Sequence, residues 1–229
     1  MNLELFEKKT GIAFTDKQLL TTAFTHRSYL NEHREGGREH NERLEFLGDA
    51  ILELAVTEFL YKKYPRKPEG ELTALRSALV NFVALAGVAE RLGMNEYILL
   101  SKGERKDTGR AREVILANAL EALIGALYLD GGYISAEAFI AREIYPLLET
   151  IVAQGGWIDA KSKFQEKAQE EVGVTPRYET VGERGPDHNK NFTVGVFLGH
   201  EKIAEGTGKS KQEAETAAAA AGLQKKGWG

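Results

Sequence analysis

Three acidic side chains, Glu42, Glu45 and Asp49, lie three and four residues apart within residues 40–52, HNERLEFLGDAIL. The apolar residues of this segment have helical spacing, which makes Glu45 and Asp49 neighbours on the opposite side of a helix. Like charges at this spacing repel each other. On this segment alone the ordinary interpretation is a solvated helix face, but Phe46, a large aromatic residue beside the acidic stripe, does not fit it.

A second segment, residues 112–129, carries Asn118 and Glu121 within an almost continuous apolar sequence. A helix that is apolar on all sides is normally buried, and a lone buried carboxylate is costly unless something neutralises it. One possible partner is an arginine, such as Arg76. Gly125 lies on the same stripe as Asn118 and Glu121, so a second helix can approach closely there.

The alternative partner is a metal ion held between the two segments. If the helices face each other, Glu45 and Asp49 lie opposite Asn118 and Glu121, and all four offer oxygen atoms. Such a set suits Mg²⁺ or Mn²⁺, which are hard ions that prefer oxygen ligands. A site of this kind usually activates water for phosphoryl chemistry. Composition and spacing leave the arginine pair and the metal site open.

The whole chain has 229 residues, a net charge of −4 and no cysteine. Its length allows one large or two modest domains, and the missing cysteines exclude disulfides and thiolate metal sites. No apolar stretch at the N-terminus resembles a secretion signal. The longest apolar run, residues 114–129, is too short to span a bilayer. We therefore expect a soluble, cytoplasmic protein without a membrane partner.

The periodicity of the chain changes near residue 153. Before that point, five segments have helical spacing, separated by prolines and glycines that include Gly131 and Gly132: residues 16–32, 43–64, 71–93, 112–132 and 135–153.

After the break QGGWIDA, we expect a helix, three short strands and an alanine-rich helix packed closely on the sheet. Ser210 and Glu213 form a capping box at the start of this last helix. The predicted organisation is a mainly helical domain, residues 1–153, a linker, residues 154–160, and an αβββα domain, residues 161–229.

Two lysines, Lys209 and Lys211, flank the start of the last predicted helix. A helix N-terminus disfavours cations and attracts anions, so the lysines indicate either a phosphate site or simply a charged surface. Residues 160–229 contain 11 lysines and arginines against 10 aspartates and glutamates, whereas residues 1–159 contain 19 against 24. The acidity therefore belongs to the helical part, whose own candidate basic loop is residues 101–112.

Taken together, these segments resemble bacterial ribonuclease III over nearly the whole chain. HNERLEFLGDAIL is similar to the signature of that family. FTHRSYLNE, PEGELTALRSALV and LANALEALIGALYLDGG resemble its other blocks in the same order. KFQEKAQE, GPDHNKNFTV and GTGKSKQEAE are similar to parts of a double-stranded-RNA-binding domain.

The resemblance implies a homodimeric, Mg²⁺-dependent endonuclease of double-stranded RNA, in which Mn²⁺ can substitute. Its products would carry 5′-phosphates and short 3′ overhangs, and its substrates would include rRNA precursors and other structured transcripts. The metal ligands implied are Glu45, Asp49 and Glu121, with Asn118 in a fourth place where many members have Asp; Asp49 and Glu121 would be catalytic.

Further roles follow from the same resemblance. Glu42 and Glu69 match acidic positions that line the family's cleft, and Phe46 matches a residue that plugs a socket on the partner subunit. The positions that match RNA contacts are Ser162, Gln165, Glu166, Gln169, His188, Lys209, Ser210 and Lys211. Such domains recognise the A-form shape of about 16 base pairs. Two other hypotheses stay open: a duplex-RNA-binding dimer that does not cleave, because of Asn118, and a metal phosphohydrolase of small substrates.

Overall fold

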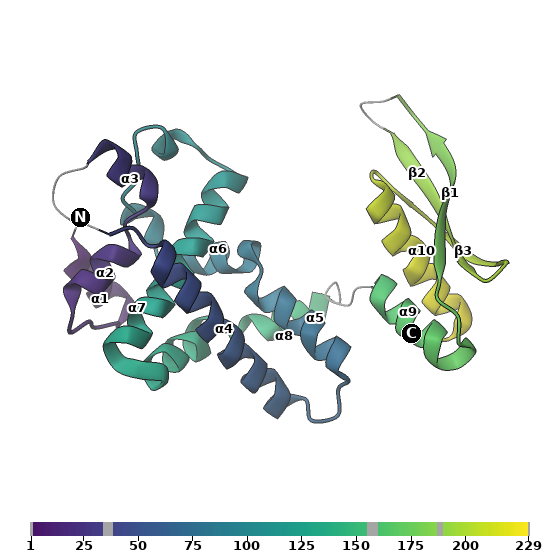
Figure 1. Cartoon of the computed structure of the whole chain (residues 1–229), viewed down its shortest axis with the longest axis horizontal. Helices are drawn as coiled ribbons and strands as arrows, with labels where there is room; N and C mark the ends of the chain where they lie inside the picture. Colours follow the sequence, from purple (N-terminus) through teal and green to yellow (C-terminus); the bar gives the residue numbers. More distant parts are fainter. Residues whose placement is uncertain (1, 34–38, 155–159, 187–189, 229) are drawn as a thin grey trace. The chain divides into compact units, whose positions relative to one another are not determined.

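The computed structural model describes residues 2–33, 39–154, 160–186 and 190–228. The chain divides into two compact units, Met1–Gly155 and Gly156–Gly229. A helical unit is followed by a smaller unit of helices and sheet (Figure 1), which confirms the predicted fold class. The predicted linker, residues 154–160, lies mostly outside the described residues, so its role stays a prediction.

The described part of the first unit contains eight α-helices and two short 3-10 helices. Their bounds are α1 (Leu3–Thr10), α2 (Lys17–Ala23), α3 (Arg27–Glu32), α4 (Glu42–Lys63), α5 (Glu69–Val80), α6 (Phe82–Arg91), η1 (Met94–Glu96), η2 (Glu104–Lys106), α7 (Arg110–Glu143) and α8 (Leu147–Gln154).

Three predicted helices of this unit are each divided in the structure, and one of them, residues 135–153, is split between the end of α7 and α8. The segment 71–93 forms α5 and α6, because Asn81 has extended backbone and its side chain accepts a hydrogen bond from the N–H of Ala84 at 2.9 Å. An asparagine at such a position starts a new helix. The segment 16–32 is divided into α2 and α3 by Thr25, which pairs with Leu99 as an isolated bridge.

Helix α7 forms the centre of the unit, where it packs against α4, α6 and α2. Gly132, at the predicted break, has a non-helical φ of 73° and kinks α7 there. The apolar run 114–129 was expected to be too short to span a bilayer, but the whole of α7 is long and apolar enough to do so by length and composition. However, 61% of its most apolar window is buried inside the unit. That burial identifies α7 as a core helix.

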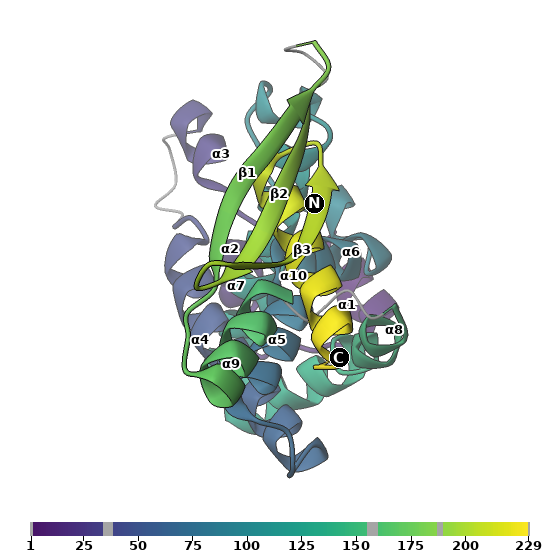
Figure 2. The same ribbon diagram turned by 90° about the vertical axis from the view of Figure 1, so that its right-hand side faces the viewer.

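The second unit is α9 (Ala160–Val172), β1 (Arg177–Arg184), β2 (Asn191–Leu198), β3 (Glu201–Gly208) and α10 (Lys211–Lys226). The strands form an antiparallel sheet in the order β1-β2-β3, and α9 and α10 pack together (Figure 2). Phe164, Val196 and Ile203 lie in the core between helices and sheet. A Cβ atom on Gly206 would lie 2.1 Å from the nitrogen of Ala218, which confirms the close packing of the alanine-rich helix on the sheet.

Candidate functional site

Helices α4 and α7 cross with their backbones in contact. A Cβ atom on Gly125 would lie 2.2 Å from the carbonyl oxygen of Leu44, which confirms the predicted close approach at Gly125. A Cβ atom on Gly48 would lie 1.8 Å from the carbonyl oxygen of Glu121. Only glycine fits at either position. The importance of Gly48 was not recognised from the sequence, although its place between Glu45 and Asp49 is the signal that could have shown it.

The crossing brings acidic side chains of both helices together. Burial, followed by the charges of Asp49 and Glu45, raises the pKa of Glu121 to about 7. Burial and the charge of Glu53 raise the pKa of Asp49. Each shift has the same cause, since removal from water and a nearby negative charge both disfavour a carboxylate.

The pKa of Glu45 depends on burial and on three neighbouring side chains. Burial is the main cause of its raised pKa, and Glu42 and Asp49 add to it. A hydrogen bond with the side chain of Asn118 acts in the opposite direction. The side chains of Glu45, Asp49, Asn118 and Glu121 therefore influence one another across the crossing, which is the arrangement of the second of the two alternatives that the sequence left open.

The alternative interpretation, in which Arg76 neutralises Glu121, is not supported by the structure. Arg76 instead donates a hydrogen bond from Nη1 to Thr57 Oγ1 at 3.1 Å, and no lysine or arginine is among the causes of the Glu121 pKa shift. Within the described ranges, no three histidine, aspartate or glutamate side chains are arranged to hold a metal ion as they stand. The metal assignment of these residues therefore stays a prediction.

A divalent cation nevertheless fits the chemistry of this donor set. The described residues offer carboxylate and amide oxygens, and the pKa values of three of these carboxylates, Glu45, Asp49 and Glu121, are raised. A bound cation would reverse these shifts, because it favours the charged form of every carboxylate around it. The residues present are thus consistent with a Mg²⁺ or Mn²⁺ site.

The two predicted cleft residues lie at helix starts. Glu42 begins α4 and is 3.2 Å from Nη1 of Arg27. Glu69 begins α5, where its side chain accepts a hydrogen bond from Thr73 Oγ1 at 3.0 Å. Acidic side chains at these places are favoured by the helix dipole, so their positions alone do not establish an RNA contact.

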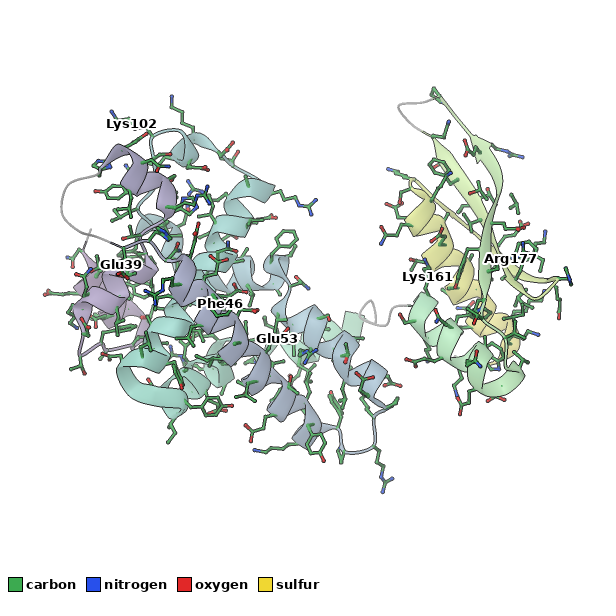
Figure 3. All side chains as sticks on the ribbon, viewed as in Figure 1. Glu39, Phe46, Glu53, Lys102, Lys161 and Arg177 are labelled. Atoms are coloured by element: carbon green, nitrogen blue, oxygen red, sulfur yellow. The ribbon has the colours of Figure 1, made fainter. Side chains whose placement is uncertain are left out.

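Phe46 projects from α4 (Figure 3) with 81% of its surface exposed, an unusual state for a phenylalanine. It borders a groove of about 950 Å³ that is also lined by Leu19, Leu47 and Leu129. Leu129 is itself 52% exposed. An exposed aromatic side chain therefore borders a groove of mixed lining, in which these leucines lie among charged residues such as Glu39 and Arg43.

In the second unit, four predicted RNA contacts lie together on α9. Ser162, Gln165, Glu166 and Gln169 line one surface pocket with Glu170. His188, the predicted second contact, lies outside the described residues.

The structure confirms the Ser210 half of the predicted capping box at the start of α10, whereas Glu213 accepts from the residue before Ser210. Ser210 Oγ accepts a hydrogen bond from the N–H of Glu213 at 3.1 Å, and Glu213 Oε2 accepts one from the N–H of Lys209 at 2.8 Å. Lys209 and Lys211 are both exposed beside this helix start. The side chains of Ser210 and Glu213 thus cap the helix start themselves, and phosphate binding by the two lysines stays a prediction.

The basic loop of the first unit is held in place by α3. The N–H of Ser101 donates to Ser28 Oγ at 3.1 Å, and the N–H of Lys102 donates to Glu32 Oε2 at 3.2 Å. Lys102 and Arg105 remain exposed to solvent. These anchors were not predicted, because the contacts span about seventy residues of sequence.

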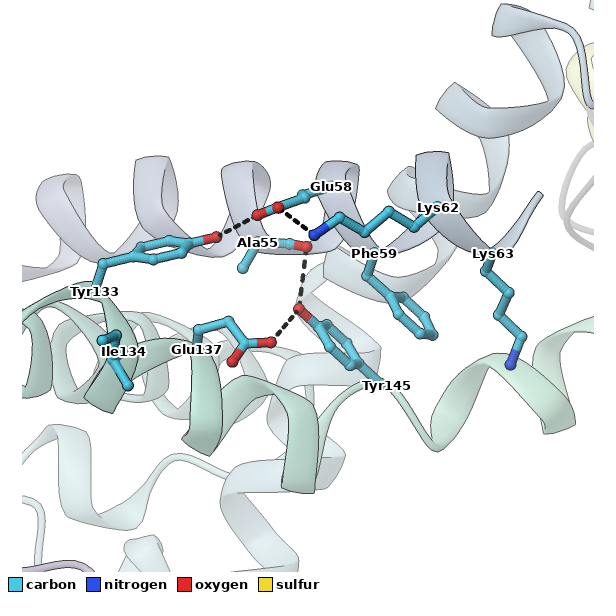
Figure 4. A pocket seen from close by; sticks show the side chains of 9 residues that line it. All are labelled: Ala55, Glu58, Phe59, Lys62, Lys63, Tyr133, Ile134, Glu137 and Tyr145. Atoms are coloured by element: carbon cyan, nitrogen blue, oxygen red, sulfur yellow. Dashed lines mark hydrogen bonds and ion pairs between the residues drawn. The ribbon is translucent and has the colours of Figure 1, made fainter. Parts of the chain in front are cut away.

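A separate pocket of about 640 Å³ lies between the second half of α4 and the part of the chain that follows the kink in α7 (Figure 4). Tyr133 Oη donates to Glu58 Oε2 at 3.2 Å, and Tyr145 Oη donates to the carbonyl of Ala55 at 3.1 Å. Lys62 Nζ lies 2.5 Å from Glu58 Oε1. These polar groups bind one another, and none of them belongs to the predicted site.

A helical unit with a carboxylate-rich helix crossing, followed by an αβββα unit, defines a class of proteins: nucleases that carry a double-stranded-RNA-binding domain. Residues 16–148 match the family model described as Ribonuclease-III-like. Residues 160–226 match the family model of the double-stranded RNA binding motif.

Individual relatives agree with both models. Ribonuclease 3 of Bacillus cereus strain AH820 and that of Bacillus anthracis are each 46% identical over 225 residues, covering 97% of this chain and 90% of the relative. A solved nuclease domain of ribonuclease III from Campylobacter jejuni is 40% identical with a TM-score of 0.57, covering 63% of this chain and 99% of that chain. The chain belongs to the ribonuclease III family. Its family and its second domain together support a double-stranded-RNA endoribonuclease.

Proposed function

We propose that this protein hydrolyses phosphodiester bonds of double-stranded RNA with the help of Mg²⁺ or Mn²⁺, leaving 5′-phosphates and short 3′ overhangs. The observation that carries the proposal is the group of mutually destabilised carboxylates at the α4–α7 crossing, in a chain that also has an RNA-binding domain. When bound, the cation supplies activation of water and stabilisation of the leaving 3′-oxygen.

The residues of this chain hold the cation and keep their carboxylates available. Glu45, Asp49 and Glu121 provide charged oxygen atoms, with Asp49 and Glu121 as the catalytic pair. Asn118 contributes an amide that orients the neighbouring groups. The partial burial of Glu121 strengthens its interaction with any cation, because charges attract more strongly away from water. Glu42 and Glu69 line the approach to these residues.

The second unit supplies affinity for the substrate. The polar residues of α9 fit the shallow minor groove of A-form RNA, His188 provides a second minor-groove contact, and Lys209, Ser210 and Lys211 bind phosphates at the start of α10. Recognition of this kind depends on shape rather than on sequence. The natural substrates we propose are rRNA precursors and other structured transcripts in the cytoplasm.

The active form we propose is a homodimer. The Campylobacter jejuni structure is described as flexible in a region involved in dimer formation of the nuclease domain. In this chain, exposed Phe46 borders a groove that contains Leu19, Leu47 and Leu129, so two copies related by a two-fold axis can each bury the phenylalanine of the other against these leucines.

A second candidate function is duplex-RNA binding without cleavage, which Asn118 favours because it removes one negative charge from the metal position. Incubation of a long RNA duplex with the full chain, in Mg²⁺ and in EDTA, separates the two. We expect short duplex products in Mg²⁺ and intact RNA in EDTA. Binding without products in Mg²⁺ would establish the second function, and cleavage of small phosphate esters but not of duplex RNA would indicate a different hydrolase.

A further inference from the structure

At the turns that carry the acidic side chains, the α4–α7 crossing leaves no room for a Cβ atom on either of two glycines. Gly48 lies between Glu45 and Asp49 and faces the carbonyl oxygen of Glu121. Gly125 lies one turn after Glu121 and faces the carbonyl oxygen of Leu44, the residue before Glu45. Each glycine therefore meets the backbone of the other helix next to a carboxylate.

We propose that Gly48 and Gly125 are positioning residues of the metal centre: they set the helix separation at which carboxylates of both helices reach one small divalent cation. This inference rests on the proposed metal-dependent activity. Asp49 has a short side chain, which cannot follow a helix that moves away. The separation of the two backbones thus decides whether Asp49 and Glu121 can act on the same ion.

The structure gives a minimum for the displacement that a methyl group would cause. Real Cβ atoms essentially never approach another heavy atom closer than 3.0 Å. An alanine at position 48 must move from 1.8 Å to at least that distance, a displacement of about 1.2 Å, whereas one at position 125 must move from 2.2 Å, a displacement of about 0.8 Å. The obstructing atoms belong to helical backbone, so the helices themselves must separate.

Such a separation affects cations differently according to size. Mg²⁺ requires nearly ideal octahedral geometry at about 2.0–2.1 Å, whereas Ca²⁺ accepts ligands at about 2.3–2.6 Å in flexible geometry. The alanine variants are therefore expected to lose affinity for Mg²⁺ more than for Ca²⁺. A loss of packing alone would weaken both ions equally, so the ratio of the two affinities reports positioning.

The experiment compares Gly48→Ala, Gly125→Ala and Gly87→Ala with the wild type in the full chain. Gly87 is an exposed glycine of α6 whose added Cβ would meet nothing within 4 Å, so it is a matched control. Affinities for Mg²⁺ and Ca²⁺ are obtained from the rise in unfolding temperature as each ion is titrated into metal-free protein. Cleavage of duplex RNA by the wild type is measured in parallel.

We expect Gly87→Ala to have the ion affinities of the wild type, with a higher unfolding temperature in the absence of ions because alanine favours the helix. Gly125→Ala should fold with roughly 10- to 100-fold weaker Mg²⁺ binding and a smaller loss for Ca²⁺. Gly48→Ala should show a larger Mg²⁺ loss. Unchanged Mg²⁺ affinity in Gly125→Ala, an equal loss for both ions, or failure of both crossing variants to fold would overturn the inference. A wild type that binds Mg²⁺ without cutting RNA would overturn the proposed activity instead, and would leave the affinity ratio as the test of positioning.

Discussion

Replacement of Glu121 by glutamine tests the metal assignment through both activity and stability. Glutamine keeps the shape of the side chain and removes its charge. If Glu121 binds the cation, cleavage in saturating Mg²⁺ is abolished while duplex binding is unchanged, because the second unit supplies the affinity. In the absence of metal the same change stabilises the protein, since it removes a charge that is costly where it lies.

The pKa of Glu121 gives the size and the pH range of this stabilisation. Its rise from 4.5 to about 7 corresponds to roughly 3 kcal/mol, which partial solvent screening reduces to about 2 kcal/mol. Below pH 4.5 the group is protonated in both folded and unfolded chains, so the cost is absent. As the pH rises to 7 the unfolded chain releases the proton first, and the stability of the wild type falls relative to the variant.

The measurement is thermal unfolding of the metal-free proteins in EDTA at pH 4.5 and at pH 8. We expect nearly equal unfolding temperatures at pH 4.5 and a variant that is about 4–8 °C more stable at pH 8. Glu149→Gln is a suitable control, because Glu149 is an exposed glutamate of α8 far along the chain from the crossing. Its unfolding temperature should follow that of the wild type at both pH values.

Two results would refute this reasoning separately. Cleavage by Glu121→Gln at more than a few per cent of the wild-type rate would show that Glu121 is not a metal ligand. A variant that is less stable than the wild type at pH 8 would show that the Glu121 carboxylate has a stabilising partner in the folded protein.

Three further predictions concern the partner subunit, the RNA and the amide. Phe46→Asp should shift the protein towards monomer in analytical ultracentrifugation and reduce cleavage, whereas Val83→Asp, at an exposed valine of α6, should not. Deletion of residues 155–229 should leave a folded dimer whose RNA affinity at physiological salt is at least roughly tenfold weaker; unchanged affinity contradicts the assignment of the RNA contacts. Asn118→Ala should slow cleavage roughly 10- to 100-fold, and added Mg²⁺ should restore part of the rate. Asn118→Asp should bind Mg²⁺ more tightly. If only Asn118→Asp cleaves RNA, the natural protein is a duplex-RNA-binding protein without nuclease activity.

The sequence was sufficient for features that depend on local patterns. The helical period predicted α4 and the central part of α7, and the Ser210 half of the capping box appears as expected. Gly125 was recognised because it shares a stripe with Asn118 and Glu121, which required only the geometry of one helix. The order of helices and strands in the second unit was predicted for the same reason.

Features that depend on contacts between distant segments could not be predicted in this way. The partner of Gly125 is α4, and no pattern within α7 identifies it. Arg76 was a reasonable neutralising partner for Glu121, but its position on α5 places it beside Thr57 instead. The division of residues 71–93 at Asn81 has a local cause, because asparagine favours a helix start. The helical spacing of apolar residues continues on both sides of Asn81, so the sequence pattern alone predicted one helix.

An asparagine, rather than an aspartate, at position 118 has different consequences for the α4–α7 crossing without a cation and with one. Without a cation, three carboxylates already disfavour one another's ionisation, and a fourth at position 118 would add to that cost. An amide avoids the charge, and its hydrogen bond with Glu45 lowers the pKa of that group. The same side chain also has a carbonyl oxygen that can face a cation or a water molecule. An asparagine at position 118 therefore avoids part of the charge repulsion that the metal-free crossing would otherwise have, while it keeps an oxygen atom available to a cation.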